Sequence, residues 1–184
     1  MKKILICFLA ACSFTFAQEK TKLTKPEDSN KTLIISNKNI ISFAPVFNFT
    51  LGKYKDMMPY GYGAEATYKR IFSDRWQLGF GGNYANMTKY PNVINISTIY
   101  SVVSFRIFTA NNVTTYIQMD TGLAAVQKIN TSTNEVAASN YHSLNLIASL
   151  SFEPNLILNF KVYSSFINPE YINIGIGAGI GFLL

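Results

Sequence analysis

Few residues of this sequence are suited to proton transfer or nucleophilic attack, and the best placed are His142 and Ser143. His142 is the only histidine among the 184 residues, and a histidine beside a hydroxyl can activate that hydroxyl as a nucleophile. The surrounding segment alternates apolar and polar residues, as a β-strand does when successive side chains point to opposite faces. This alternation separates His142 from Ser143, so they cannot easily share a proton, and nothing in the sequence holds Glu135 near them.

A second set of residues with chemical potential is charged. Glu65, Lys69, Arg106, Asp120 and Lys161 each fall on the polar face of an alternating segment. Counted along their segments, Glu65, Asp120 and Lys161 lie at similar heights, whereas Lys69 and Arg106 lie nearer one end. If these faces enclose a narrow interior, opposite charges should pair, because an unpaired charge in a poorly hydrated space is costly. We therefore expect these five residues to form a lumen charge network.

The sequence carries no motif for a cofactor or a metal. The glycines at 175–181 are spaced by two and lack the G-x-G-x-x-G pattern and following helix of a dinucleotide site. No group of histidine, cysteine or acidic residues has metal-ligand spacing. We therefore expect no cofactor, no metal site and no catalytic site.

The N-terminus predicts export. Residues 2–11 combine two lysines with an apolar run, and Thr15 and Ala17 supply the small residues that a signal peptidase reads before Gln18. The apolar run is shorter than the roughly 20 residues of a membrane-spanning helix. Cleavage before Gln18 would remove both cysteines and exclude disulfides and thiolate metal sites. The alternative is a lipoprotein signal, in which the chain would be lipidated at Cys12.

From Ile40 onward, apolar residues recur with a period of two, which indicates β-strands. The clearest segment is 172–182, where apolar residues alternate with one asparagine and four glycines. The least regular is 94–108, where the alternation is clean only from Ile99 to Ile107. Eight strands are predicted, at 40–53, 60–72, 75–85, 94–108, 113–125, 140–152, 155–166 and 171–183. The connections at 73–74, 109–112 and 153–154 are short, and those at 54–59, 86–93 and 126–139 are longer.

The composition of the two strand faces favours a membrane barrel over a secreted soluble barrel. Charged residues make up 14% of the chain, against about 25% in an ordinary soluble domain. The polar face consists mainly of small uncharged residues, which suit the narrow lumen of an eight-stranded barrel, so the apolar face should meet lipid. We expect the outward set to include Leu146, Leu150, Leu158, Ile174 and Ile176. Aromatic residues also gather at both strand ends, as membrane-interface bands require.

The aromatic residues expected in the two bands can be named. The band at the short-turn ends comprises Phe72, Trp76, Phe108, Phe152 and Phe182. The band at the long-loop ends comprises Tyr54, Tyr62, Tyr84, Tyr141, Phe166 and Tyr171.

These features resemble the small eight-stranded outer-membrane barrels of the OmpA-transmembrane and OmpX type, over residues 40–184. The resemblance implies an all-β fold, a single antiparallel eight-stranded transmembrane β-barrel in the outer membrane of a Gram-negative bacterium. A signal peptide at 1–17 and a flexible periplasmic lead segment at 18–39 would precede it. Outer-membrane lipid and the barrel-assembly machinery are the implied partners. That machinery reads a final strand ending in an aromatic residue, and here Phe182 is followed by two leucines.

The resemblance transfers no catalytic positions, so we expect a non-enzymatic barrel that presents surface loops in a structural or surface-interaction role. One alternative is a narrow transporter for small or apolar solutes, as in OmpW-like barrels. A second alternative is a lipid-modifying enzyme similar to lipid A deacylases, with His142 as its base. The sequence names no extracellular partner. Without Lys2 and Lys3 the net charge falls from +6 to +4, and without a basic patch this predicts no nucleic-acid partner.

Overall fold

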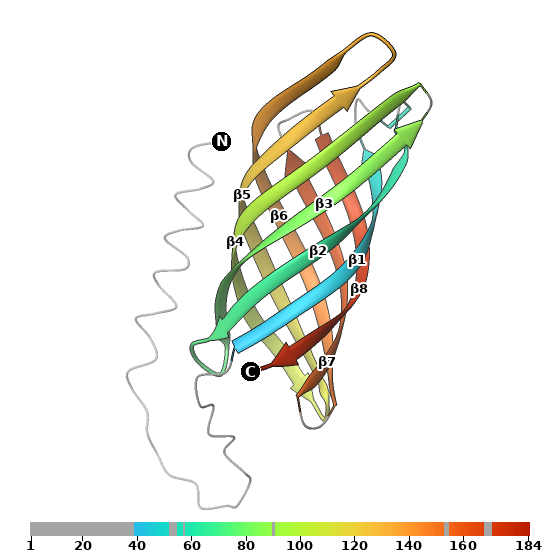
Figure 1. Ribbon diagram of the computed structural model, residues 1–184. Helices are drawn as coiled ribbons and strands as arrows, with labels where there is room; N and C mark the ends of the chain where they lie inside the picture. Colours follow the sequence, from blue (N-terminus) through green and yellow to red (C-terminus); the bar gives the residue numbers. More distant parts are fainter. Residues whose placement is uncertain (1–38, 52–54, 57, 90, 153–154, 168–170) are drawn as a thin grey trace, which may run out of the picture. The chain divides into compact units, whose positions relative to one another are not determined.

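A computed structural model describes residues 39–51, 55–56, 58–89, 91–152, 155–167 and 171–184. The predicted signal peptide and nearly all of the lead segment lie outside the described residues, so cleavage before Gln18 stays a prediction. The described chain forms a closed antiparallel barrel of eight strands, in which each strand pairs with its neighbours in sequence and β8 pairs with β1 (Figure 1). The strands are β1 Asn39–Leu51, β2 Tyr60–Ile71, β3 Trp76–Lys89, β4 Asn92–Ala110, β5 Val113–Ile129, β6 Asn134–Phe152, β7 Leu156–Ile167 and β8 Tyr171–Leu183. The predicted fold class is confirmed.

The described residues contain no helix long and apolar enough to cross a membrane.

The barrel has two different ends. At the turn end, β2 joins β3 through residues 72–75, β4 joins β5 through 111–112, and Leu184 exchanges two backbone hydrogen bonds with Asn39. Asn111 adopts a positive φ of 51° in its turn, a conformation that asparagine tolerates better than most residues. At the loop end, β3, β4, β5 and β6 extend furthest.

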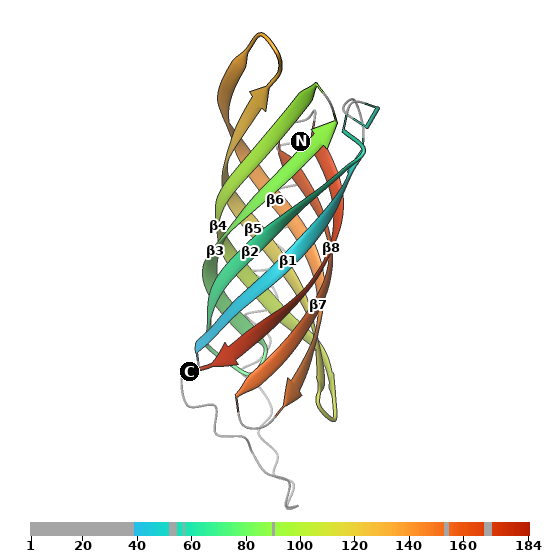
Figure 2. The ribbon, with the colours of Figure 1, turned by 45° about the vertical axis from the view of Figure 1, so that its right-hand side comes forward.

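The connections at the loop end are shorter than the sequence suggested. Residues 86–93 and 126–139 were expected to be loops, but β3 runs to Lys89 and β4 starts at Asn92, while β5 and β6 are joined by residues 130–133 alone. Asn130 closes that turn, because its side chain accepts hydrogen bonds from the backbone N–H groups of Ser132 and Thr133 at 2.8 and 2.7 Å. The β5–β6 hairpin therefore projects beyond the rest of the barrel (Figure 2). The loop prediction was wrong because the apolar residues of these segments move from the outer face to the inner face of their strands, whereas the sequence prediction expected them to stay on one face.

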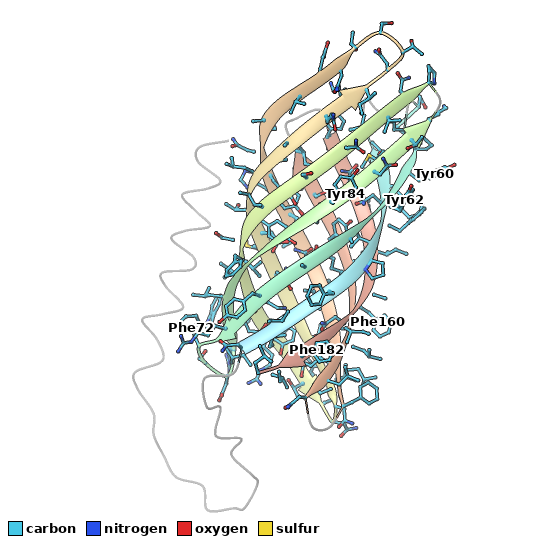
Figure 3. The ribbon with its side chains drawn as sticks, in the orientation of Figure 1. Tyr60, Tyr62, Phe72, Tyr84, Phe160 and Phe182 are labelled. Carbon is cyan, nitrogen blue, oxygen red and sulfur yellow. The ribbon has the colours of Figure 1, made fainter. Side chains whose placement is uncertain are left out.

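The outer face of the barrel carries an apolar belt. All eight strands contribute exposed apolar or aromatic side chains, including Phe47, Tyr62, Phe80, Ile99, Met119, Leu144, Phe160 and Ile176. The predicted outward residues Leu146, Leu150, Leu158, Ile174 and Ile176 are all exposed or partly exposed. Side chains of Tyr60, Tyr62 and Tyr84 project outward toward the loop end, and those of Phe72 and Phe182 at the turn end (Figure 3).

Two members of the predicted aromatic band at the loop end are placed differently. Tyr141 and Tyr171 are 2% and 4% exposed and lie inside the barrel. The reason is the alternation of side chains along a strand. Tyr141 and Tyr171 are adjacent in sequence to the outward residues His142 and Ile172, so they face inward. Tyr54 lies outside the described residues. Of the predicted members, Tyr62, Tyr84 and Phe166 therefore remain in the outward aromatic band at the loop end, together with Tyr60.

The interior is divided into two parts. Toward the loop end, buried apolar side chains form one cluster, made of Met58, Ala85, Met87, Ile94, Ile96, Tyr100, Val102, Ala124, Val126, Tyr141, Ile167 and Tyr171. Toward the turn end, the buried residues of β3–β5 are polar: Gln77, Ser104, Gln118 and Asp120. The apolar cluster closes the barrel above a polar chamber, and the candidate site lies in that chamber.

Candidate functional site

The centre of the polar chamber is an ion pair between Lys161 on β7 and Glu65 on β2. The Lys161 ammonium donates a hydrogen bond to Glu65 Oε2, and both side chains are 7% exposed. Lys161 points across the barrel because its neighbour on β8 is Gly177, whose missing side chain leaves room for the lysine stem. The ammonium also lies 4.6 Å from the ring centroid of Tyr163, a cation–π contact that adds to its stabilisation.

Asp120 on β5 is held by neutral hydrogen-bond donors. Its carboxylate accepts hydrogen bonds from the Ser143 hydroxyl at 2.7 Å and the Asn145 amide at 2.8 Å. The Gln118 amide nitrogen donates a third, at 2.9 Å. Hydrogen bonds to the charged form of a buried carboxylate offset part of the cost of removing it from water.

Gln118 also joins Asp120 to the second lysine. Its amide oxygen accepts hydrogen bonds from the Ser104 hydroxyl at 2.9 Å and from the Lys69 ammonium at 3.4 Å. Lys69 therefore reaches Asp120 through one amide group instead of by direct contact. Two buried lysines face two buried carboxylates, so the chamber carries no net charge when all four are ionised.

Of the five residues predicted for the lumen network, the structure brings four into the chamber. Glu65 and Lys161 pair directly, and Asp120 and Lys69 are joined through Gln118. Arg106 is not among them: it lies at the turn end, where its backbone N–H donates to Arg75 O at 2.8 Å. Sequence reasoning missed the neutral members Gln118, Ser104 and Asn145. Alternation along the strands predicts that these three side chains face inward. The sequence prediction did not consider amides and hydroxyls as hydrogen-bond partners of the buried charged groups.

The chamber has almost no free space. A cavity of about 20 Å³ remains beside Glu65, Lys69 and Lys161, and one water needs about 10–15 Å³ measured in this way. Nearer the loop end, the Tyr163 hydroxyl donates a hydrogen bond to Asn48 Oδ1. Tyr163 lies over Gly175, where an added Cβ would come within 2.2 Å of its ring. The lumen is filled by side chains at both levels.

His142 has a partner that the sequence did not indicate. His142 is exposed and Ser143 is 5% exposed, so they face opposite sides of the wall, as alternation predicted. The imidazole Nδ1 instead lies 2.7 Å from the hydroxyl of Thr121, which is opposite His142 on β5. No acidic side chain among the described residues is hydrogen-bonded to this imidazole. The described residues also contain no group of three histidine, cysteine or acidic side chains able to hold a metal.

A second candidate site is the free edge of the β5–β6 hairpin. β6 pairs with β5 from Asn134 to Leu150. Its pairing with β7 begins only at Tyr141. Residues 134–140 therefore form a strand whose second edge has no partner strand among the described residues. These residues are almost all exposed, and Val136 is 68% exposed.

The comparisons with known proteins support the fold alone. No family model and no curated protein sequence matches this chain. The structure is similar to that of neisserial surface protein A (NspA), with a TM-score of 0.63 and 12% identity over 78% of this chain and 96% of that one. It is also similar to Ail, the attachment invasion locus protein of Yersinia pestis, with a TM-score of 0.58 and 14% identity over 82% and 100%.

A third similar structure is the N-terminal β-barrel domain of OprF from Pseudomonas aeruginosa. The TM-score is 0.54 and the identity 12%, over 81% of this chain and 100% of that domain. The chain has the fold of the small eight-stranded outer-membrane barrels.

Proposed function

We propose that this protein spans the outer membrane, with its turn end in the periplasm and its loop end outside the cell. The proposal is supported by the continuous apolar belt, by outward aromatic residues at both ends of it, and by the predicted export signal. Bacterial outer-membrane barrels typically have short turns on the periplasmic side and longer loops on the extracellular side. On this proposal, outer-membrane lipid surrounds the belt, and the barrel-assembly machinery inserts the chain through β8, which carries Phe182.

We further propose that the protein is non-enzymatic and binds an extracellular protein through the free edge of β6. This proposal rests on residues 134–140, which pair with β5 on one side and, among the described residues, have no partner strand on the other. An exposed strand edge offers a row of backbone N–H and C=O groups to which an extended segment can add as another strand. Its exposed side chains are small, apart from Val136 and Glu135, so a partner strand can approach closely.

The transporter alternative is disfavoured by the filled interior. A solute crossing the barrel would have to displace the ion pair of Glu65 and Lys161 and then the apolar cluster above it. We expect the pure, folded protein to show no stable conductance in a planar lipid bilayer. Stable conductance of porin size would reverse this ranking and favour the transporter.

The interaction proposal is tested by shortening the hairpin. Residues 127–136 are deleted and Val126 is joined to its cross-strand partner Ala137 through Asn-Gly, a sequence that favours a tight hairpin turn. Val126 stays in the apolar cluster, so the barrel should still fold. Cells displaying the shortened chain should bind surfaces coated with fibronectin, laminin or collagen no better than cells lacking it, whereas the full chain should increase binding to at least one coating.

The matched control keeps the edge and changes only its charges. Lys128 and Glu135 are opposite one another in the hairpin, and replacing both with glutamine leaves the strand length intact. This variant should bind as the unmodified chain does. Heat-modifiability on a gel checks that all three proteins are folded barrels. If the shortened, folded chain binds as well as the full chain, the hairpin edge is not the interaction site.

A further inference from the structure

The turn end carries a polar hollow between the start of β3 and the end of β4. It has a volume of about 350 Å³ and is lined mainly by polar atoms of Arg75, Phe105, Arg106, Ile107, Phe108 and Thr109. Its size falls within the roughly 300–1,000 Å³ of typical small-molecule sites. The hollow lies at the edge of the apolar belt, beside the exposed side chains of Ile107 and Phe108. It is separate from the polar chamber that holds Glu65 and Lys161.

Two local structures form the walls of this hollow. One is the turn before β3, where the Ser73 hydroxyl accepts hydrogen bonds from the backbone N–H groups of Arg75 and Trp76 at 3.3 and 3.2 Å. The other is a β-bulge in β4, where Arg106 pairs with Tyr116 and Phe108 with Thr115, which leaves Ile107 as the extra residue. A bulge redirects side chains locally. Here the bulge occurs next to Arg106, where β4 continues beyond its pairing with Trp76, the first residue of β3.

The two arginines of the hollow have no counter-charge within the part of the chain that the structure describes. Among the described residues no carboxylate lies within ion-pair distance of either guanidinium, although Asp74 is next to Arg75 in sequence. Arg75 is exposed and Arg106 partly exposed, and both line the hollow. Guanidinium groups bind phosphate oxygens through paired hydrogen bonds. The hollow therefore offers positive charge and guanidinium donors to an anion.

We propose that this hollow binds the phosphate group of a net-anionic glycerophospholipid, held with its acyl chains against the apolar belt. The inference rests on the proposed membrane location, because it requires inner-leaflet lipid at the turn end. The acyl chains would lie along Phe105 and Phe108, and the phosphate would enter between Arg75 and Arg106. The apolar residues on the hollow's rim favour a lipid over a soluble anion, since a soluble phosphate would leave them uncovered.

Trp76 allows a direct test because it is the only tryptophan of the chain and borders the hollow. Its ring packs against Phe105, with centroids 4.8 Å apart. The full mature chain is folded into phosphatidylcholine vesicles in which the same mole fraction of either brominated phosphatidylglycerol or brominated phosphatidylcholine is included. Brominated phosphatidylglycerol should quench Trp76 more strongly. The preference should fall roughly fivefold for each arginine replaced, at low salt, in R75Q, R106Q and the double variant.

Arg70→Gln is the matched control, because Arg70 is exposed on the same rim beside Phe72 and outside the hollow. It removes one positive charge and should keep most of the preference. Equal quenching by the two brominated lipids, in a protein that both lipids quench, overturns the site and leaves the membrane location intact. Quenching by neither lipid overturns both. If soluble glycerol phosphate at millimolar concentration abolishes the preference, the hollow binds free phosphate and the lipid assignment is wrong.

Discussion

The same three strands, β3, β4 and β5, present opposite polarities at the two ends of the barrel. Near the turn end, Gln77, Ser104 and Gln118 point inward, and Leu78, Val103 and Met119 point outward. Near the loop end, Met87, Ile96 and Val126 point inward, and Asn86, Asn95 and Gln127 point outward. The strands and the facing rule are unchanged, and only the chemistry of each face has been exchanged.

The exchange indicates where the solvent changes. An apolar outer face is stable against lipid, and a polar outer face is stable against water. The outward amides at the loop end bond to one another, as Asn86 donates to Asn95 Oδ1 at 2.7 Å and Asn95 donates to Gln127 at 3.2 Å. Their neighbours on the inside pack as the core of a soluble β-protein does. On β4 the change falls between Ile99 and Asn95, which we take as the level of the outer membrane surface.

The largest effect is expected in the polar half, on replacing Lys161 with methionine. Glu65 would lose its partner, and the chamber would hold two carboxylates against Lys69 alone. Removing one member of a buried ion pair typically costs about 3–5 kcal/mol, because the other charge is left buried. Urea unfolding of the protein in lipid vesicles, followed by Trp76 fluorescence, measures this loss.

The control for this variant removes both charges, in Glu65→Gln with Lys161→Met. Asp120 and Lys69 then remain joined through Gln118, and the double variant should be more stable than Lys161→Met alone. If Lys161→Met unfolds at the same urea concentration as the unmodified protein, Glu65 is solvated by water in the chamber and the ion pair is not truly buried.

The sequence was sufficient to predict the fold class, the eight strands and the outward set on β6–β8, because a single rule of alternation applies along those strands. It was insufficient on β4, where the outward apolar residues do not continue before Ile99. The structure explains the failure: Ile94 and Ile96 face inward and Ile99 outward, so the apolar residues change face within one strand. The prediction assumed that the outer face of each strand meets lipid along its whole length. Because the outer face becomes polar near the loop end, the ends of β3–β6 were predicted as loops.

For the candidate site, the alternation of side chains predicted that Glu65, Asp120 and Lys161 face inward. It could not predict which of them form an ion pair. Whether Lys161 meets Glu65 or Asp120 depends on the stagger between strands that are not neighbours, which no local pattern encodes. The free edge of β6 was also invisible, because it exists only where β7 ends before β6 does. The hollow beside Arg75 needs a bulge that alternation does not reveal.

An arginine scan along β5 sharpens the comparison by locating the change of solvent. Met119 and Ala125 both point outward and stand six residues apart on that strand. Arginine at a lipid-facing position near the bilayer midplane costs about 2–4 kcal/mol, falling to about 0–1 near the interfaces. Met119→Arg should therefore be strongly destabilising and Ala125→Arg nearly neutral, as measured by urea unfolding in vesicles. Equal costs at the two positions would mean that both lie at the same depth, against our placement of the boundary.

The smallest expected effect is on the apolar side of the comparison, where Ile96→Val removes one methyl group from the loop-end cluster. Ile96 is 2% exposed and packs inside the barrel, above the membrane level inferred here. Core substitutions of this kind cost about 0.5–1.5 kcal/mol, because the lost contacts are only partly restored by relaxation. The informative control is Ile99→Val on the same strand, whose side chain is 69% exposed on the outer belt. Lipid tails can fill the space of a missing methyl group, so Ile99→Val should be close to neutral. A larger loss at Ile99 than at Ile96 would show that the loop-end cluster is not a packed core, and the contrast between the two halves would then rest on the polar chamber alone.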